Sequence, residues 1–143
     1  YYGESLFPEM NYFSLRFTTE TLDLNVDPVV GSGDVVVLDI FAECQDGMIF
    51  PKEGEYTVVD MERVENGYAM SGANYQGSNL GCYVMFAEDG KSVGGDYITS
   101  GTIKITGTPS KAVVTADVKL EISGESRSYK YVGPLAIKDV SQQ

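Results

Sequence analysis

The sequence contains no histidine and no tryptophan, and positive charge is scarce in it. Without histidine, Ser-His-Asp and Cys-His catalysis, histidine metal sites and histidine pH switches are excluded. Without tryptophan, a sugar platform built on that residue is excluded too. Ten Lys and Arg stand against 21 Asp and Glu, a net charge of −11. So negative a field disfavours nucleic acids and anionic membrane surfaces as partners.

Long apolar runs and a signal peptide are also missing. No segment approaches the apolar length of a membrane span, and no basic stretch precedes an apolar one near the start. The chain begins at Tyr1 without methionine, which we interpret as a processed or trimmed form. Cys44 and Cys82 are the only cysteines. They allow a disulfide in an oxidising compartment or two free thiols.

Apolar and polar residues alternate along most of the chain, which is typical of half-buried strands. The predicted strands cover residues 12–18, 21–27, 34–42, 55–61, 80–87, 97–107, 112–122 and 126–132. No segment shows helical periodicity for more than about two turns. The 143 residues suit one domain with its own core. We therefore predict a single all-β domain over residues 1–143, an antiparallel β-sandwich or flattened β-barrel of about eight to nine strands.

Several turns and irregular stretches follow from glycine. Asp89-Gly90 between two strands predicts a tight hairpin, and Gly101 predicts a bend or bulge inside its strand. Residues 62–79 have no clear period and predict a loop or a weak hairpin. The last three strands are joined by short turns and predict a meander. In its middle strand one set of residues is predicted to face inward: Val114, Ala116, Val118, Leu120 and Ile122.

One acidic stretch is superficially similar to a calcium loop. Asp23, Asn25 and Asp27 place an oxygen at every second position. Pro28 stands where an EF-hand needs glycine, and the flanking helices are absent from the pattern. The alternative is a strand with a polar outer face. We predict no metal site and keep these three residues as a weak candidate.

The sequence offers no catalytic motif. Among 21 acids some carboxylate pair at the spacing of a glycosidase is expected by chance, and nothing marks one pair as desolvated. No nucleophile elbow, phosphate loop or Cys-x-x-Cys motif is present. We predict a protein that is not an enzyme and needs no cofactor. A small enzyme that acts on glycosides or peptides is an alternative.

The ten tyrosines are the best candidates for recognition. A tyrosine presents a flat apolar face and a polar tip, which suits an interface. Five of them fall in predicted loops, at the terminus or at strand ends: Tyr1, Tyr2, Tyr68, Tyr75 and Tyr97. They predict either a patch that binds protein, peptide or glycan, or a set of rings that cap the ends of the core.

Four segments of the chain carry short strand and turn motifs. They are residues 51–58 (PKEGEYTV), residues 97–105 (YITSGTIKI), the stretch from residue 116 to residue 135, which ends in YVGPL, and the opening Tyr1-Tyr2-Gly3. Together these segments resemble small all-β lipoprotein domains of Bacteroidetes. The first is similar to the P-x-G-x-Y-T-V strand entry of those domains, the second to their Y-I-T-S-G-T-V-x-V segment, the third to their closing hairpin and the fourth to their Y-Y-G start.

This resemblance implies a lipid-anchored protein of the outer membrane or cell surface, with its lipidated cysteine upstream of Tyr1. It implies a non-enzymatic accessory subunit or binding module of an outer-membrane complex that takes up nutrients such as glycans or peptides. Its partners would be outer-membrane transporter proteins and a glycan or peptide, with membrane contact only through the anchor. The alternative is an adhesin or fimbria-like structural subunit, which donates or accepts a strand at an open sheet edge.

Overall fold

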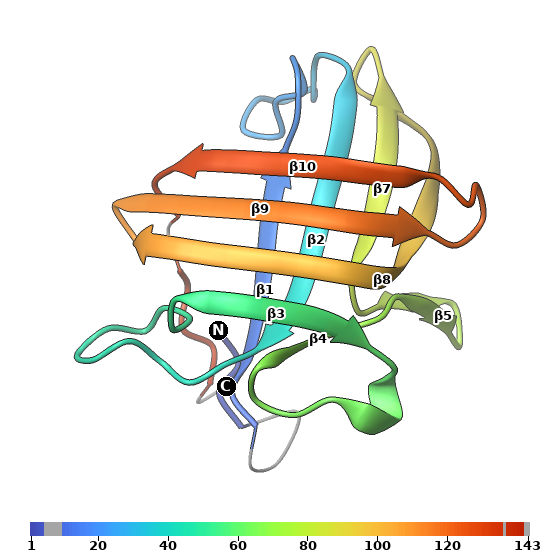
Figure 1. Cartoon of the computed structure of the whole chain (residues 1–143). Coiled ribbons are helices and arrows are strands. Elements are labelled where there is room, and N and C mark those ends of the chain that lie inside the picture. Colours follow the sequence, from blue (N-terminus) through green and yellow to red (C-terminus); the bar gives the residue numbers. More distant parts are fainter. Residues whose placement is uncertain (5–9, 136, 142–143) are drawn as a thin grey trace.

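The strands form two layers whose directions cross (Figure 1). The computed structural model describes residues 1–4, 10–135 and 137–141. The back layer contains β1 (Tyr12–Thr18), β2 (Gly33–Phe41) and β7 (Tyr83–Glu88). The front layer contains β3 (Gly54–Val59), β9 (Lys111–Leu120) and β10 (Ser126–Gly133), and the long β8 (Lys91–Thr108) belongs to both.

β8 joins the layers because each half of it has different partners. Its first half pairs with β7, and its second half pairs with β3 and β9. The pairing with β9 shifts register between Ile98 and Ser100, next to Gly101, so the predicted irregularity is confirmed. Such shifts let a strand turn the corner between crossed sheets.

The pairing also closes a ring. β2 pairs with β4 (Tyr68–Met70), β4 with β3, β3 with β8, β8 with β7, and β7 with β2. β1 extends the back layer beyond β2, and β9 and β10 extend the front layer. The all-β prediction is therefore confirmed, as a small closed barrel flattened into two layers.

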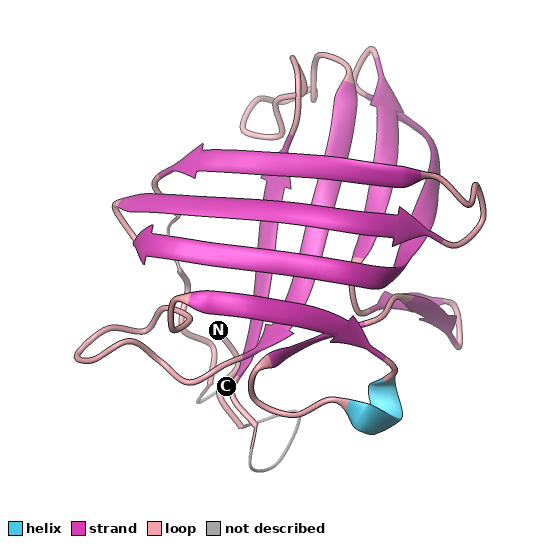
Figure 2. Cartoon of the chain, viewed as in Figure 1, coloured by secondary structure: helices cyan, strands magenta, loops and turns pink. Residues whose placement is uncertain are grey.

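The antiparallel prediction is wrong at one place. β3 and β4 run parallel, because the 3-10 turn η1 (Met61–Arg63) and the loop after it carry the chain back before β4 begins. The strand count also differs from the predicted eight to nine. The described residues hold ten strands, since the irregular stretch contains β4 and the hairpin of β5 (Ala73–Tyr75) and β6 (Ser78–Leu80). Figure 2 shows how short these three are.

The core lies between the layers and follows the predicted alternation. Phe13, Leu15 and Phe17 of β1 are buried against Val36, Leu38 and Ile40 of β2. The predicted inward residues of β9 are buried up to Leu120. β2 is also covered on its outer face, where Val35 and Val37 meet Leu22 and Val29 of the loop between β1 and β2. Because both faces of β2 are covered, its sequence is a nearly unbroken apolar run.

The strand predicted over residues 21–27 is wrong. This stretch is a loop with one isolated bridge, Asp23 to Val30. The Asp23 carboxylate accepts the Asn25 amide at 2.8 Å, a local bond that competes with strand pairing. Leu22 is buried, while Leu24 and Val26 stay exposed, so the alternation has no partner strand.

Ile122 was also predicted wrongly as an inward residue. Its relative exposure is 73%, because β9 ends at Leu120 and the chain turns. The hairpin predicted at Asp89-Gly90 is confirmed, with Glu88 opposite Lys91 and positive φ at both turn residues. The meander of β8, β9 and β10 is confirmed as well.

One end of the core is closed by an ionic contact between the layers. Arg127 of β10 reaches Asp34 of β2 at 3.1 Å and stacks on the Phe86 ring of β7 at 4.9 Å. The Tyr129 hydroxyl donates to the same Asp34 oxygen at 2.9 Å. Burial of Tyr129 raises its pKa to about 12, so it keeps its proton.

Candidate functional site

Among the described strands, β1 and β10 are the two ends of the sheet path, so each has an edge that pairs with no other described strand, which we call a free edge. Two backbone hydrogen bonds that flank the β1–β2 pairing show which N–H and C=O groups of β1 point toward β2. The Ala42 amide donates to the Asn11 carbonyl at 3.1 Å, and the Thr19 amide donates to the Asp34 carbonyl at 3.0 Å. In an antiparallel pair these positions alternate with positions whose N–H and C=O point away from the partner. The positions of β1 that point away are Tyr12, Ser14, Arg16 and Thr18.

Tyr12 already has a partner on this side. Its carbonyl accepts the Tyr2 amide at 2.9 Å, and its own amide donates to the Gly3 carbonyl at 3.0 Å. Within the described residues, no backbone hydrogen bond reaches Ser14, Arg16 or Thr18 from the outer side. Three consecutive outward positions of a strand are therefore open to a further strand.

The free edge of β1 borders a groove. Two hollows of about 340 and 360 Å³ lie along it, and both are lined by Arg16 and Leu135. We call their union the β1 groove. The further residues that line it at the Tyr1 end are Tyr1, Tyr2, Ser14, Leu15, Ile137, Lys138 and Val140. At the other end they are Phe17, Thr18, Leu24, Asn25, Tyr131 and Pro134.

The far wall of the groove is the C-terminal strap, defined as residues 134–135 and 137–141. In Figure 1 this segment leaves the end of β10 and runs down the left side toward the terminus. The Leu135 amide donates to the Pro109 carbonyl at 2.8 Å, and the Val140 amide donates to the Tyr1 carbonyl at 2.9 Å. The strap is thus held at both ends, and its Leu135 and Ile137 pack against the core beside β1.

The charge of the groove is opposite to that of the whole chain. Arg16 and Lys138 line it, and no Asp or Glu is among the described residues that do. The rest of the lining mixes polar residues with apolar and aromatic ones, and among the aromatic ones the rings of Phe17 and Tyr131 lie 5.7 Å apart. The groove therefore combines open backbone groups, an apolar floor and two cations.

A buried carboxylate lies on the outer face of the sheet, next to the groove. Asp39 of β2 is only 4% exposed and stands opposite Ser14. Its Oδ2 accepts the Tyr12 hydroxyl at 2.7 Å, while Oδ1 has no partner of good geometry among the described residues. The Cys82 thiol lies 3.6 Å from the Asp39 carbonyl. Burial raises the pKa of Asp39, although Tyr12, Ser14, the Gly81 amide and Arg16 act against it.

We expect Asp39→Asn to stabilise the protein at neutral pH. The raised pKa means that the folded state holds the proton more tightly, so ionisation destabilises it above the ordinary pKa of an aspartate. Removing a buried, partly unpaired charge should raise the free energy of unfolding by roughly 1 kcal/mol at pH 7. The gain should vanish below about pH 4, where both states are protonated. Urea unfolding at both pH values measures it.

The exposed Asp46 provides the control, because Asp46→Asn should change little at either pH. A loss of stability in Asp39→Asn at pH 7 would contradict the prediction. It would mean that the interactions of Asp39 with Arg16 and Tyr12 exceed the free-energy cost of burying its charge.

The structure brings together only two of the five predicted tyrosines. Tyr1 and Tyr2 line the β1 groove; Tyr1 packs on Phe13 with ring centres 4.6 Å apart, and Tyr2 stacks on Tyr12 at 4.9 Å. Burial raises the pKa of the Tyr1 hydroxyl to about 12, and this hydroxyl donates to Asn11 at 3.1 Å. These two rings therefore pack on aromatic side chains of β1 and also line the groove.

The other three tyrosines lie elsewhere. Tyr68 is half-buried in β4, and Tyr75 is 59% exposed in β5. Tyr97 of β8 donates its hydroxyl to Asn79 of β6 at 2.8 Å. These three are thus outside the β1 groove.

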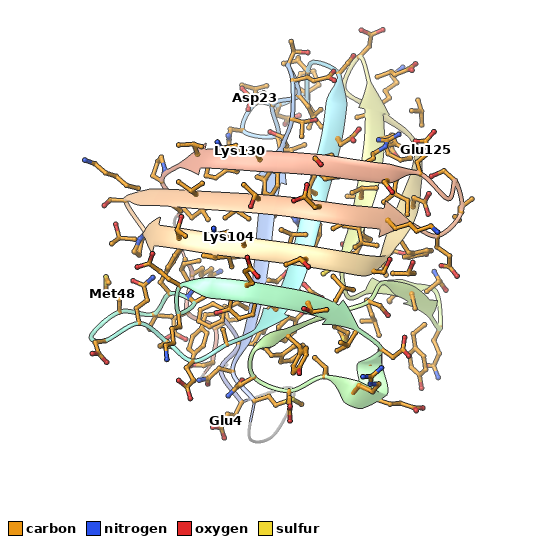
Figure 3. The ribbon with its side chains drawn as sticks, viewed as in Figure 1. Glu4, Asp23, Met48, Lys104, Glu125 and Lys130 are labelled. Atoms are coloured by element: carbon orange, nitrogen blue, oxygen red, sulfur yellow. The ribbon has the colours of Figure 1, made fainter. Side chains whose placement is uncertain are left out.

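The weak calcium candidate is not assembled into a site. Figure 3 shows Asp23 in the loop at the upper end of β1. The Asp23 carboxylate accepts a hydrogen bond from the Asn25 amide. The described residues contain no group of three Cys, Asp or Glu side chains that could hold a metal. Both cysteines are free thiols, Cys82 buried and Cys44 half-buried.

Sequence reasoning missed the residues that make the groove. The alternation of residues 12–18 puts Arg16 on the polar face of its strand, but nothing in the sequence marks that strand as an edge. Leu135, Ile137 and Lys138 follow the last predicted strand, where no period distinguishes a strap from a tail. No feature of the sequence distinguishes Arg16 and Lys138 from the rest of the ten Lys and Arg residues.

Comparisons with family models, with curated proteins and with solved structures found no match. No helix in the described part of the chain is long and apolar enough to cross a membrane.

Proposed function

We propose that this chain is a non-enzymatic binding module that takes up an extended segment of another polypeptide along the free edge of β1. The observation that carries the proposal is the groove beside three outward backbone positions, Ser14, Arg16 and Thr18. An added strand would bond to these groups and place alternate side chains over the apolar floor. Main-chain bonds supply affinity in this mode, and the floor supplies selectivity.

The proposal includes the location that the sequence resemblance implies. The module would be a lipid-anchored outer-membrane or cell-surface protein, an accessory subunit of a nutrient-uptake complex whose transporter or cargo supplies the extended segment. What supports this part is the sequence resemblance, together with the groove beside the free edge of β1.

The same edge also favours a second candidate function. An adhesin or fimbria-like subunit accepts a strand from the next subunit, and it needs an open edge beside a groove. The two candidates differ in the source of the strand. Extraction in mild detergent followed by mass spectrometry distinguishes them, because a transporter partner supports the first and polymers of repeated subunits support the second.

A proline at the free edge tests strand addition directly. Arg16→Pro removes an outward N–H without breaking a bond to β2, and edge positions of this kind tolerate proline. We expect it to weaken peptide binding by at least about tenfold. Amide chemical shifts of Ser14 and Thr18 during titration with extended peptides provide the measurement.

Lys130→Pro is the matched control, since it changes the free edge of β10, and Lys130, labelled in Figure 3, lines neither hollow of the β1 groove. The Leu120 amide donates to the Glu125 carbonyl, which by alternation places the Lys130 amide on the outer side. Both variants lose one cation and one outward N–H. Equal loss of binding in both, or shifts outside β1 in the parent, would refute the proposal.

A further inference from the structure

We infer that the segment bound in the β1 groove alternates apolar with acidic residues, its acidic side chains lying over the outer face of β1. This inference rests on the proposed function and specifies the chemical class of its ligand. It follows from the two different faces that β1 presents to any strand added at its edge.

The inner face of the groove requires apolar side chains. On β1, Leu15 and Phe17 point into the core and are 2% and 5% exposed. A strand added beside them would point every second side chain the same way, toward Leu135 and Tyr131. A polar side chain placed there would lose its water without gaining a hydrogen-bond partner.

The outer face of the groove requires negative charge. On this face β1 carries Ser14, Arg16 and Thr18, with Arg16 at the centre. Opposite charges on neighbouring strands attract, and like charges directly opposite repel. Lys138 of the strap lines the same hollow as Arg16 and adds a second cation. Acidic residues of the ligand would thus lie near two cations.

The acid nearest to Arg16 does not line the groove: Asp39 interacts electrostatically with Arg16, but it is 4% exposed and borders neither hollow. The net charge is −11, but the described residues that line the groove include no carboxylate. At physiological ionic strength the screening length is about 8 Å, so groups in contact dominate over charges farther away. The selectivity should therefore persist at about 0.15 M salt and fade at about 1 M.

The same charge disfavours a second copy of this chain as the occupant. Two β1 edges paired about a two-fold axis in the symmetric register would place Arg16 opposite Arg16. That contact repels, and a charge on an edge strand is a common protection against self-pairing. The free edge is thus suited to a foreign acidic strand.

The length of the ligand follows from the length of the edge. Tyr12 is already paired with the N-terminal residues, so the open edge runs over residues 14–18. At about 3.3 Å per residue it accommodates a core segment of about five residues. Suitable probes are capped Val-X-Val-X-Val peptides with glycine-serine flanks, in which X is Glu, Ser or Lys.

The test titrates these peptides into the 143-residue chain and follows the Ser14, Arg16 and Thr18 amides at about 0.15 M salt. We expect the Glu peptide to bind about five- to tenfold more tightly than the Lys peptide, with the Ser peptide between. Arg16→Glu should reverse this order, whereas Lys130→Glu, with the same change of charge on β10, should leave it unchanged.

The outcomes separate this inference from the proposed function. If all three peptides shift the β1 amides with equal affinity, strand addition stands and the acidic preference is wrong. If none shifts them, both are wrong. If light scattering shows that the chain dimerises through β1, the occupant is a second copy, and the inference again fails. Reversal of the order in Arg16→Glu alone supports it.

Discussion

Replacing Gly101 with alanine should lower the free energy of unfolding by about 3–5 kcal/mol, the sum of backbone strain and steric overlap. Gly101 has φ of +129°, a region that residues with a side chain rarely adopt. A Cβ atom there would lie 2.2 Å from the Asp117 carbonyl oxygen, which belongs to the backbone of β9 and is fixed by its ladder. Neither partner can move without breaking strand pairs.

The effect should extend beyond the residue itself because Gly101 lies at the register shift where β8 passes between the layers. A loss of 3–5 kcal/mol corresponds to a melting temperature lower by roughly 10–15 °C in a domain of this size. Thermal and urea unfolding followed by circular dichroism measure it. A variant that does not fold when expressed would agree with the upper part of this range.

Gly77→Ala is the matched control, since it separates strain from overlap. Gly77 also has a positive φ, +85°, but no atom lies within 4 Å of a Cβ built there. We expect a loss of about 1 kcal/mol from conformation alone. Equal losses in both variants would show that overlap with Asp117 contributes nothing.

The sequence could predict strands wherever burial on one face imposes a period of two. β1, β9 and β10 were located to within one or two residues for this reason. The same signal failed at residues 21–27, because alternation records which side chains are apolar and not whether a partner strand exists. It missed β4 because three residues are too few to show a period.

The β1 groove could not be predicted by such local reasoning. It needs β1 at the end of the sheet path and the strap anchored at Pro109 and Tyr1, and both depend on contacts between segments distant in sequence. Residue type and position in loops, at the terminus or at strand ends indicate five tyrosines, and only Tyr1 and Tyr2 reach the groove. Arg16 and Lys138 become a pair only through the fold.

Replacing Asp96 with asparagine should lower the free energy of unfolding by about 2–3 kcal/mol at pH 7. The Asp96 carboxylate is 4% exposed, and it accepts the amides of Tyr97 and Ile122 at 2.8 Å and of Ser123 at 3.0 Å. Hydrogen bonds to a charged acceptor are stronger than neutral ones. Asparagine keeps one oxygen, but its NH₂ group would meet an amide that also needs an acceptor.

The weaker hydrogen bonds in Asp96→Asn should make the turn between β9 and β10 more mobile. Ile122 and Ser123 belong to that turn, and Asp96 belongs to β8. The carboxylate thus holds the turn against the middle of the long strand, and it ends β9 before Ile122. Hydrogen exchange should show faster exchange of the Ile122 and Ser123 amides in the variant, while the amides of β1 exchange as before.

The dependence on pH distinguishes the charge from the shape of the side chain. Burial alone would raise the pKa of Asp96, but the amides of Ile122, Ser123 and Tyr97 outweigh it and hold the pKa below its ordinary value. A lowered pKa in the folded state stabilises the protein above the ordinary value of about 3.8, and this stabilisation is lost as pH falls through the folded pKa. The parent should therefore approach Asp96→Asn in stability on acidification below about pH 4.

Asp60→Asn is the control for this series, because Asp60 is exposed and its side chain makes no capping hydrogen bond to η1. Its unfolding should follow the parent at every pH. Unfolding in urea from pH 7 to pH 3 gives the comparison for all three proteins. A gap between parent and Asp96→Asn that stays constant on acidification would show that the three amides recognise the oxygen atoms and not their charge.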